Sequence, residues 1–120
     1  MVRSAFAAAG LAALLAATAA TAATPKLVGT VGPGFTISLK DSHGAKVTKL
    51  KAGTYAFAIS DKASIHDFTL EQQSGGKFEK HLTSVPFQGS KTVTVTLTKG
   101  KWKYYCSAHP TSMFGSFSVS

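Results

Sequence analysis

The sequence predicts an all-β domain, either a sandwich or a barrel, for the part of the chain that follows its first 23 residues. Three observations lead to this prediction. Short runs of β-branched and aromatic residues recur, Gly, Pro, Asp and Ser separate them, and the segment after Pro25 has almost no helical spacing of apolar residues. Runs so closely spaced are typical of sandwiches and barrels.

The first residues have the composition of a signal peptide. Arg3 supplies one positive charge, and an uncharged stretch rich in Ala and Leu follows to about Ala17. A series of small residues then ends at Ala23, which suits cleavage, so we expect a cleaved signal peptide over residues 1–23 and export to a periplasm or the extracellular space. The stretch is short for a membrane span, which needs roughly 20 strongly apolar residues. An uncleaved anchor or a buried helix is the alternative.

The remaining segment, residues 24–120, is long enough for one domain with one modest core and too short for two. Turn-forming residues divide it into nine candidate strands. In chain order these span residues 26–31, 35–40, 45–50, 54–60, 67–72, 78–82, 92–98, 101–106 and 115–120.

Alternation along these strands predicts which side chains face the core. Tyr55, Phe57 and Ile59 fall on one face of their strand, and in residues 92–98 valine and leucine alternate with threonine. Successive side chains of a strand point to opposite faces, so the apolar face of each strand should be buried.

The same parity places two side chains that can bind a metal ion. Trp102, Tyr104 and Cys106 face away from the neighbouring lysines, and His66 has the parity of the apolar Phe68. We therefore expect a thiol and an imidazole at the inner ends of two strands.

Cys106 is the only cysteine of the chain, so it cannot form an internal disulfide. It is then an intermolecular partner, a buried bystander, a nucleophile or a metal ligand. His109 and Met113 follow it closely, which brings a thiolate, an imidazole and a thioether into one short loop. With His66 added, this donor set suits a copper ion that cycles between two oxidation states.

Other chemistries fit the sequence less well. A structural zinc site prefers four firm Cys or His ligands, and the spare imidazoles, His43 and His81, lie in a predicted turn and on a predicted strand surface. A hydrolytic group of His66, Asp67 and Cys106 is disfavoured because adjacent strand residues point to opposite faces. Four histidines in total are too few for the paired histidines of a multicopper oxidase, so we expect no enzyme.

The order of His66, Cys106, His109 and Met113, with Tyr104 and Tyr105 before the cysteine, resembles the cupredoxins, the blue copper proteins typified by plastocyanin, amicyanin and azurin. The resemblance covers essentially all of residues 24–120. It implies a Greek-key β-sandwich or barrel of about seven to eight strands, one mononuclear type 1 copper ion held by these four residues, and a monomeric one-electron carrier. It also implies an electron port at the edge of His109, inside an apolar patch to which Pro110, Met113 and Phe114 contribute.

Two features depart from the family pattern. Two residues separate Cys106 from His109 and three separate His109 from Met113, a spacing intermediate between the amicyanin-like and plastocyanin-like loops, so Met113 is the least secure ligand. The residue after the first ligand is Asp67, where the family often has Asn. We expect this carboxylate to accept a hydrogen bond from Ser107 and to favour oxidised copper, which lowers the potential.

Charge indicates the class of partner. The formal net charge is +8 at pH 7 and stays near +7 without Arg3, and the lysines are scattered over the domain. Redox partners with acidic surfaces are favoured, whereas nucleic acid is disfavoured because the mature part has no arginine and no stacking motif. Two alternatives stay open: an envelope copper carrier or buffer, and a copper-free interaction module in which Cys106 is merely buried.

Overall fold

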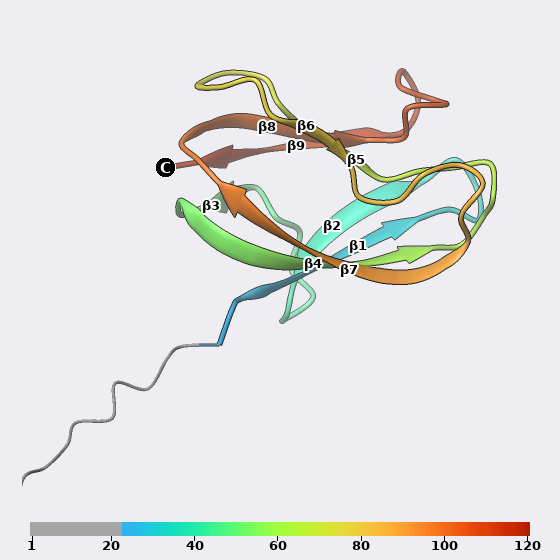
Figure 1. Cartoon of the computed structure of the whole chain (residues 1–120), viewed down its shortest axis with the longest axis horizontal. Coiled ribbons are helices and arrows are strands. Elements are labelled where there is room, and N and C mark those ends of the chain that lie inside the picture. Colours follow the sequence, from blue (N-terminus) through green and yellow to red (C-terminus); the bar gives the residue numbers. More distant parts are fainter. Residues whose placement is uncertain (1–22) are drawn as a thin grey trace, which may run out of the picture.

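The computed structural model describes residues 23–120, which form two β-sheets packed face to face (Figure 1). The predicted signal peptide lies outside the described residues, apart from Ala23. Nine strands occur in chain order: β1 Lys26–Val31, β2 Ile37–Asp41, β3 Lys49–Leu50, β4 Gly53–Asp61, β5 Thr69–Gln72, β6 Glu79–His81, β7 Gly89–Leu97, β8 Gly100–Tyr105 and β9 Phe114–Val119. The part of the chain that the structure describes contains no helix able to cross a membrane.

One sheet has the strand order β2-β1-β4-β7, and the other has the order β3-β9-β8-β5-β6. Both are mixed sheets, because β1 runs parallel to β4 and β3 runs parallel to β9, while the other pairs are antiparallel. The all-β sandwich predicted from the sequence is therefore confirmed. The described residues form nine strands rather than seven to eight because two short edge strands, β3 and β6, flank the second sheet.

The strand that was expected to begin at Asp67 begins only at Thr69. The reason is local: the backbone N–H of Phe68 donates to the side-chain hydroxyl of Thr83 at 2.9 Å instead of to a neighbouring strand. The N–H of Phe68 therefore leaves the regular ladder, although its carbonyl still accepts the backbone N–H groups of Leu82 and Thr83 at 2.7 and 3.2 Å. His66 consequently lies in the β4–β5 connection and not at a strand end.

The predicted alternation is visible in the core. Phe57 and Ile59 are buried in β4, and Trp102, Tyr104 and Cys106 are buried in or directly after β8. The core therefore fills the space between the two sheets.

An aromatic stack in this core ties the two predicted ligand segments together. The rings of Phe68 and Tyr104 are stacked with centroids 5.7 Å apart. Phe68 follows His66 by two residues and Tyr104 precedes Cys106 by two. Stacked pairs of this kind contribute about 0.5–1.5 kcal/mol beyond their burial, so the core itself fixes one segment against the other.

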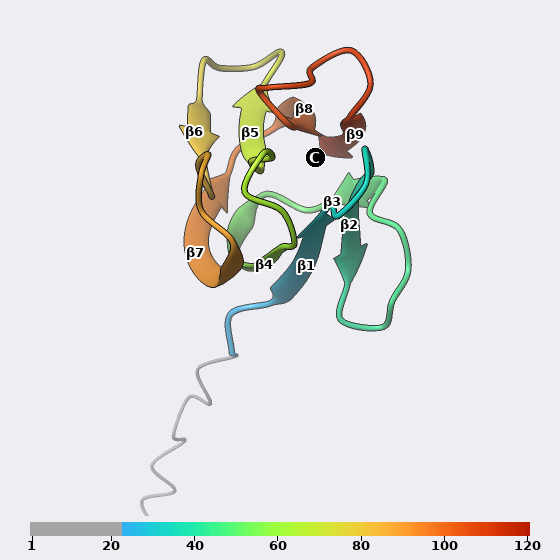
Figure 2. The ribbon, with the colours of Figure 1, turned by 90° about the vertical axis from the view of Figure 1, so that its right-hand side faces the viewer.

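Four connections lie together at one end of the sandwich, on the right in Figure 1 and facing the viewer in Figure 2. They join β1 to β2, β4 to β5, β6 to β7 and β8 to β9. The connections after β4 and β8 contain the predicted metal ligands, so both are presented at the same end of a stiff β-framework.

Candidate metal centre

The β8–β9 connection folds into a compact loop that begins at Cys106 and ends at Met113. The backbone N–H of His109 donates to the carbonyl of Cys106 at 3.1 Å, and that of Met113 donates to the carbonyl of His109 at 3.0 Å. The loop is closed by the N–H of Cys106, which donates to the carbonyl of Met113 at 3.0 Å. Its own backbone hydrogen bonds thus bring three predicted ligands together.

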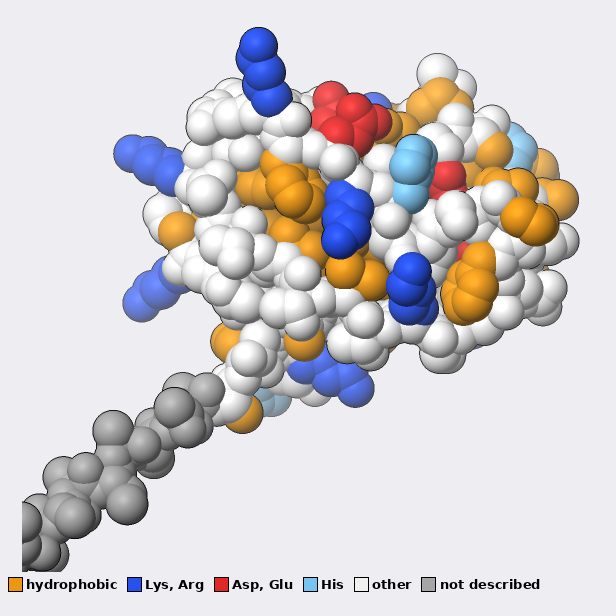
Figure 3. All heavy atoms as spheres, in the orientation of Figure 1, with side chains coloured by type: hydrophobic (Ala, Val, Ile, Leu, Met, Phe, Trp, Pro, Cys, Tyr) orange, Lys and Arg blue, Asp and Glu red, His pale blue; other side chains and the backbone are white. Residues whose placement is uncertain are grey.

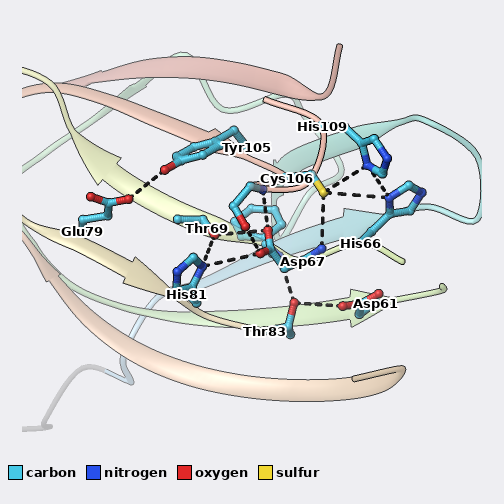
Figure 4. A network of polar contacts seen from close by, with 12 residues as sticks. Asp61, His66, Asp67, Thr69, Glu79, His81, Thr83, Tyr105, Cys106 and His109 are labelled. Carbon is cyan, nitrogen blue, oxygen red and sulfur yellow. Dashed lines mark hydrogen bonds and ion pairs between the residues drawn. The ribbon is translucent and has the colours of Figure 1, made fainter. Parts of the chain in front are cut away.

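The side chains of His66, Cys106 and His109 converge at this end of the sandwich (Figure 4). The two Nδ1 atoms are 3.2 Å apart. The Sγ atom of Cys106 lies 3.8 Å from Nδ1 of His66 and 3.6 Å from Nδ1 of His109. His66 and Cys106 are fully buried, and His109 is half-buried.

These separations fit a metal ion placed between the three atoms. Bonds of about 2.0 Å to nitrogen and about 2.3 Å to sulfur, spread at 120°, place nitrogen and sulfur about 3.7 Å apart and two nitrogens about 3.5 Å apart. The observed nitrogen–sulfur separations of 3.6 and 3.8 Å agree with this triangle, and the nitrogen–nitrogen separation of 3.2 Å needs a slightly narrower angle. The donor set, a thiolate with two imidazoles, is the one that suits copper.

Met113, the fourth predicted ligand, is buried in the core cluster at the base of the loop. Its backbone is anchored at both its N–H and its carbonyl by the bonds to His109 and Cys106. The side chain therefore belongs to the interior and does not contribute to a surface patch, which corrects the expectation drawn from the family. Its ligation of a metal stays a prediction.

The ring of His66 is oriented by packing. Its Nε2 atom is buried and has no hydrogen-bond partner among the described residues. Gly32 lies against the ring, with a positive φ of 75°, and a Cβ atom at that position would lie 3.0 Å from Cδ2 of His66. Phe35 packs edge-on to both imidazoles, at 5.5 Å from His66 and 4.8 Å from His109. The β1–β2 connection is therefore part of the site, although nothing in the sequence of Gly32 to Phe35 predicts this contact.

Asp67 joins the two ligand segments. One carboxylate oxygen accepts the backbone N–H of Ser107 at 2.7 Å, and the other accepts its hydroxyl group. The backbone N–H of Asp67 donates to Sγ of Cys106 at 3.4 Å. The hydrogen bond that the sequence predicted between Asp67 and Ser107 is confirmed, and the N–H contact ties the backbone of Asp67 to the cysteine side chain.

A second buried carboxylate, Asp61, holds the other side of the His66 segment. The hydroxyl of Thr83 donates to Asp61 at 3.0 Å and accepts the N–H of Phe68. The N–H of Ala63 donates to the other oxygen of Asp61 at 3.3 Å. Burial raises the pKa of Asp61 above its ordinary value of 3.8, and the bonds from Thr83 and Ala63 oppose that shift.

The two remaining histidines lie where the sequence placed them, on the surface. His43 is exposed in the turn after β2, where its backbone N–H donates to Asp41. His81 is an exposed residue of β6, but its Nδ1 atom lies 3.5 Å from Asp67 and 2.6 Å from the hydroxyl of Thr69. This contact was missed because it depends on the register of the β5–β6 pair, which sets His81 opposite Thr69 and which the local sequence does not indicate.

Large apolar side chains are exposed around the same end of the sandwich (Figure 3). These side chains are Phe35, Ile65, Val85, Phe87 and Phe114. Phe35 is 60% exposed although its ring packs against both imidazoles. The expected contribution of Phe114 to an apolar surface is confirmed.

Comparison with known proteins supports the fold. No protein-family model matches the chain, and no curated protein matches it. Among solved structures it is similar to the copper protein rusticyanin, with a TM-score of 0.56 and 22% identity over 79% of this chain and 76% of that chain. It is also similar to reduced rusticyanin, with a TM-score of 0.53 and 20% identity over 79% of this chain and 78% of that chain.

A reduced amicyanin variant is also similar, with a TM-score of 0.50 and 14% identity over 79% of this chain and 82% of that chain. Identities this low show the fold alone. Rusticyanin and amicyanin are both cupredoxins, and the described residues add a group of His66, Cys106 and His109 at the expected end of the sandwich. The chain therefore has the cupredoxin fold.

Proposed function

We propose that this protein is an exported one-electron carrier with one mononuclear type 1 copper ion, held by His66, Cys106, His109 and Met113. The observation that carries the proposal is the triangle of two Nδ1 atoms and one Sγ atom, with sides that fit a metal in trigonal coordination. Copper supplies the chemistry when bound, because it takes up and releases one electron between Cu(I) and Cu(II).

The protein contributes a framework that keeps the ligand positions fixed in both oxidation states. His66 is held by packing against Gly32 and Phe35, and Cys106 is held by the strand that precedes it and by the N–H of Asp67. A ligand set fixed on rigid elements moves little when the charge of the metal changes. Fast electron exchange follows from such small movement.

His109 is proposed as the port through which the electron passes. It is the one member of the His66, Cys106 and His109 group that is not fully buried, and Phe35 covers part of its ring. The exposed apolar residues around it provide a contact surface without fixed charge. The lysines elsewhere on the domain would attract a partner with an acidic surface and raise the association rate.

A copper carrier or buffer is the alternative, since it would use the same donor atoms. Two of the donors, on His66 and Cys106, are fully buried. Ligand exchange with another protein needs accessible donors, so this burial favours electron transfer over copper handling. The role proposed here is therefore electron transfer rather than metal storage.

The test is a visible absorption spectrum of the mature protein after addition of Cu(II). We expect an intense thiolate-to-copper band that is lost in Cys106→Ser and retained in His43→Ala, which removes an imidazole remote from the site. No band in the wild-type protein would overturn the copper proposal and favour the interaction module. N-terminal sequencing of protein recovered from the cell envelope or medium tests cleavage after Ala22 or Ala23.

A further inference from the structure

An exposed histidine lies beside the carboxylate that links the two ligand segments. Nδ1 of His81 is 3.5 Å from a carboxylate oxygen of Asp67. Asp67 is buried, whereas the side chain of His81 is 53% exposed. The contact joins the solvent to the interior beside the proposed copper site (Figure 4).

The direction of the hydrogen bonds can be derived from the number of protons available. Thr69 has one hydroxyl proton, and its Oγ1 atom lies 3.2 Å from Asp67 and 2.6 Å from Nδ1 of His81. An ionised carboxylate only accepts hydrogen bonds. The hydroxyl must therefore donate to Asp67, so it accepts from His81, which carries a proton on Nδ1.

This assignment gives a continuous chain of four groups. His81 donates to Thr69, Thr69 donates to Asp67, and Asp67 accepts both the N–H and the hydroxyl of Ser107. Ser107 directly follows Cys106, and the N–H of Asp67 reaches the cysteine sulfur. This series of hydrogen bonds thus runs from a surface imidazole to the first residues of the loop that carries Cys106 and His109.

The register of the sheet explains why this series of hydrogen bonds forms. Thr69 of β5 lies opposite His81 of β6 and also opposite Tyr105 of β8, so the three side chains share the outer face of the sheet. The hydroxyl of Tyr105 donates to a carboxylate oxygen of Glu79 at 2.8 Å, so its proton is not directed at Asp67. Lys103 of β8 lies over the Tyr105 ring, with its Nζ atom 4.9 Å from the ring centroid. His81 is therefore the available counter-group for Asp67.

We propose that His81 is a positioning residue of the metal centre: through Thr69 and Asp67 it holds Ser107, and with it the loop that carries Cys106 and His109. A buried carboxylate is costly unless hydrogen bonds and opposite charge support it. The Nδ1–H of His81 completes that support and also offsets part of the negative charge beside the sulfur. The proposal rests on the copper function for its effect on potential, but its structural part does not.

The structural part is tested on the metal-free protein, by amide hydrogen exchange at Ser107. His81→Leu removes the donor and should accelerate exchange of this amide about tenfold or more, whereas His81→Asn keeps a donor near the Nδ1 position and should restore most of the protection. His43→Leu, at a remote exposed turn, should change nothing. Circular dichroism and thermal unfolding of each variant establish that it is folded.

The charge part is tested on the copper-loaded protein by its midpoint potential. His81→Leu leaves Asp67 uncompensated and should lower the potential, while the same substitution in an Asp67→Asn background should have no effect, because the two positions act as one unit. Unchanged Ser107 exchange in a folded His81→Leu variant would overturn the proposal. If exchange of the Ser107 amide accelerates in His81→Leu but no copper binds to the wild-type protein, the positioning role of His81 is supported and the proposed electron transfer fails.

Discussion

Thr83 occupies a position where one hydroxyl group completes two buried hydrogen bonds next to the His66 segment. It donates to Asp61 at 3.0 Å and accepts the N–H of Phe68 at 2.9 Å, and its side chain is 2% exposed. Thr83→Val keeps the shape of the side chain but removes both bonds. We therefore expect a large loss of stability from a substitution that leaves the packing almost unchanged.

The magnitude follows from the two groups left without a partner. A buried N–H without a partner costs about 1–3 kcal/mol, and a hydrogen bond to a charged group contributes about 1.5–3 kcal/mol. Together they predict a loss of roughly 2.5–6 kcal/mol, a large part of the 5–15 kcal/mol typical of a domain. At about 4–8 °C per kcal/mol for a domain of this size, Tm should fall by at least ~10 °C.

The pH dependence has a definite sign. Burial raises the pKa of Asp61 above 3.8, so the folded protein binds this proton more tightly than the unfolded chain does. Stability from this group is therefore greatest below pH 3.8 and falls as the pH rises through the folded-state pKa. The bond from Thr83 opposes the shift, so Thr83→Val should raise the pKa of Asp61 further. The variant should consequently lose more stability at pH 7 than at acidic pH.

The assay is thermal and urea unfolding of the metal-free mature protein at pH 7 and at pH 4. Thr83→Ser is the matched control, since it retains the hydroxyl and removes only a methyl group, at a cost of about 1 kcal/mol. If Thr83→Val were no less stable than Thr83→Ser at pH 7, the hydroxyl would not hold the His66 segment and the reasoning would be refuted.

Three further outcomes are expected. Gly115→Ala should cost about 1–3 kcal/mol in thermal unfolding, because the new methyl group would collide with the buried ring of Tyr104. Burial and the bond to Glu79 raise the pKa of Tyr105 to about 12, so ultraviolet titration should show this phenol ionising late, and stability should fall as the pH rises from 10 through 12. Met113→Leu should cost less than about 1.5 kcal/mol but weaken Cu(II) binding in a competition titration; equal affinity would remove Met113 from the ligand set.

Strand parity and local order were sufficient to predict the metal-capable group. Cys106, His109 and Met113 lie within one short loop, so their proximity depends on sequence distance alone. His66 and Cys106 were placed together by the assumption that apolar faces are buried, and both prove to be buried. For Cys106 the inference succeeds because alternation is a property of its own strand and needs no knowledge of its neighbours. His66 lies before β5, in a segment outside the strand, so its burial does not follow from strand alternation.

The polar contacts around the site depend on strand register and could not be derived in this way. His81 reaches Asp67 only because β6 pairs with β5, and Phe35 reaches the imidazoles only because the β1–β2 connection lies at the same end of the sandwich. These pairs are between 14 and 74 residues apart in the chain. Residue type gave no signal either, since an exposed histidine or phenylalanine on a surface needs no special explanation.

Net charge was equally uninformative about the interior. The chain carries +8, yet two of its five acidic residues, Asp61 and Asp67, are buried on either side of the His66 segment. Hydroxyl groups and backbone N–H groups support both carboxylates. A lysine or arginine close to the sulfur would favour reduced copper strongly, whereas hydroxyl and N–H donors hold the loop while adding little charge. The proposed copper site can therefore be rigid without a fixed cation, and we expect its potential to respond to the one imidazole that touches Asp67.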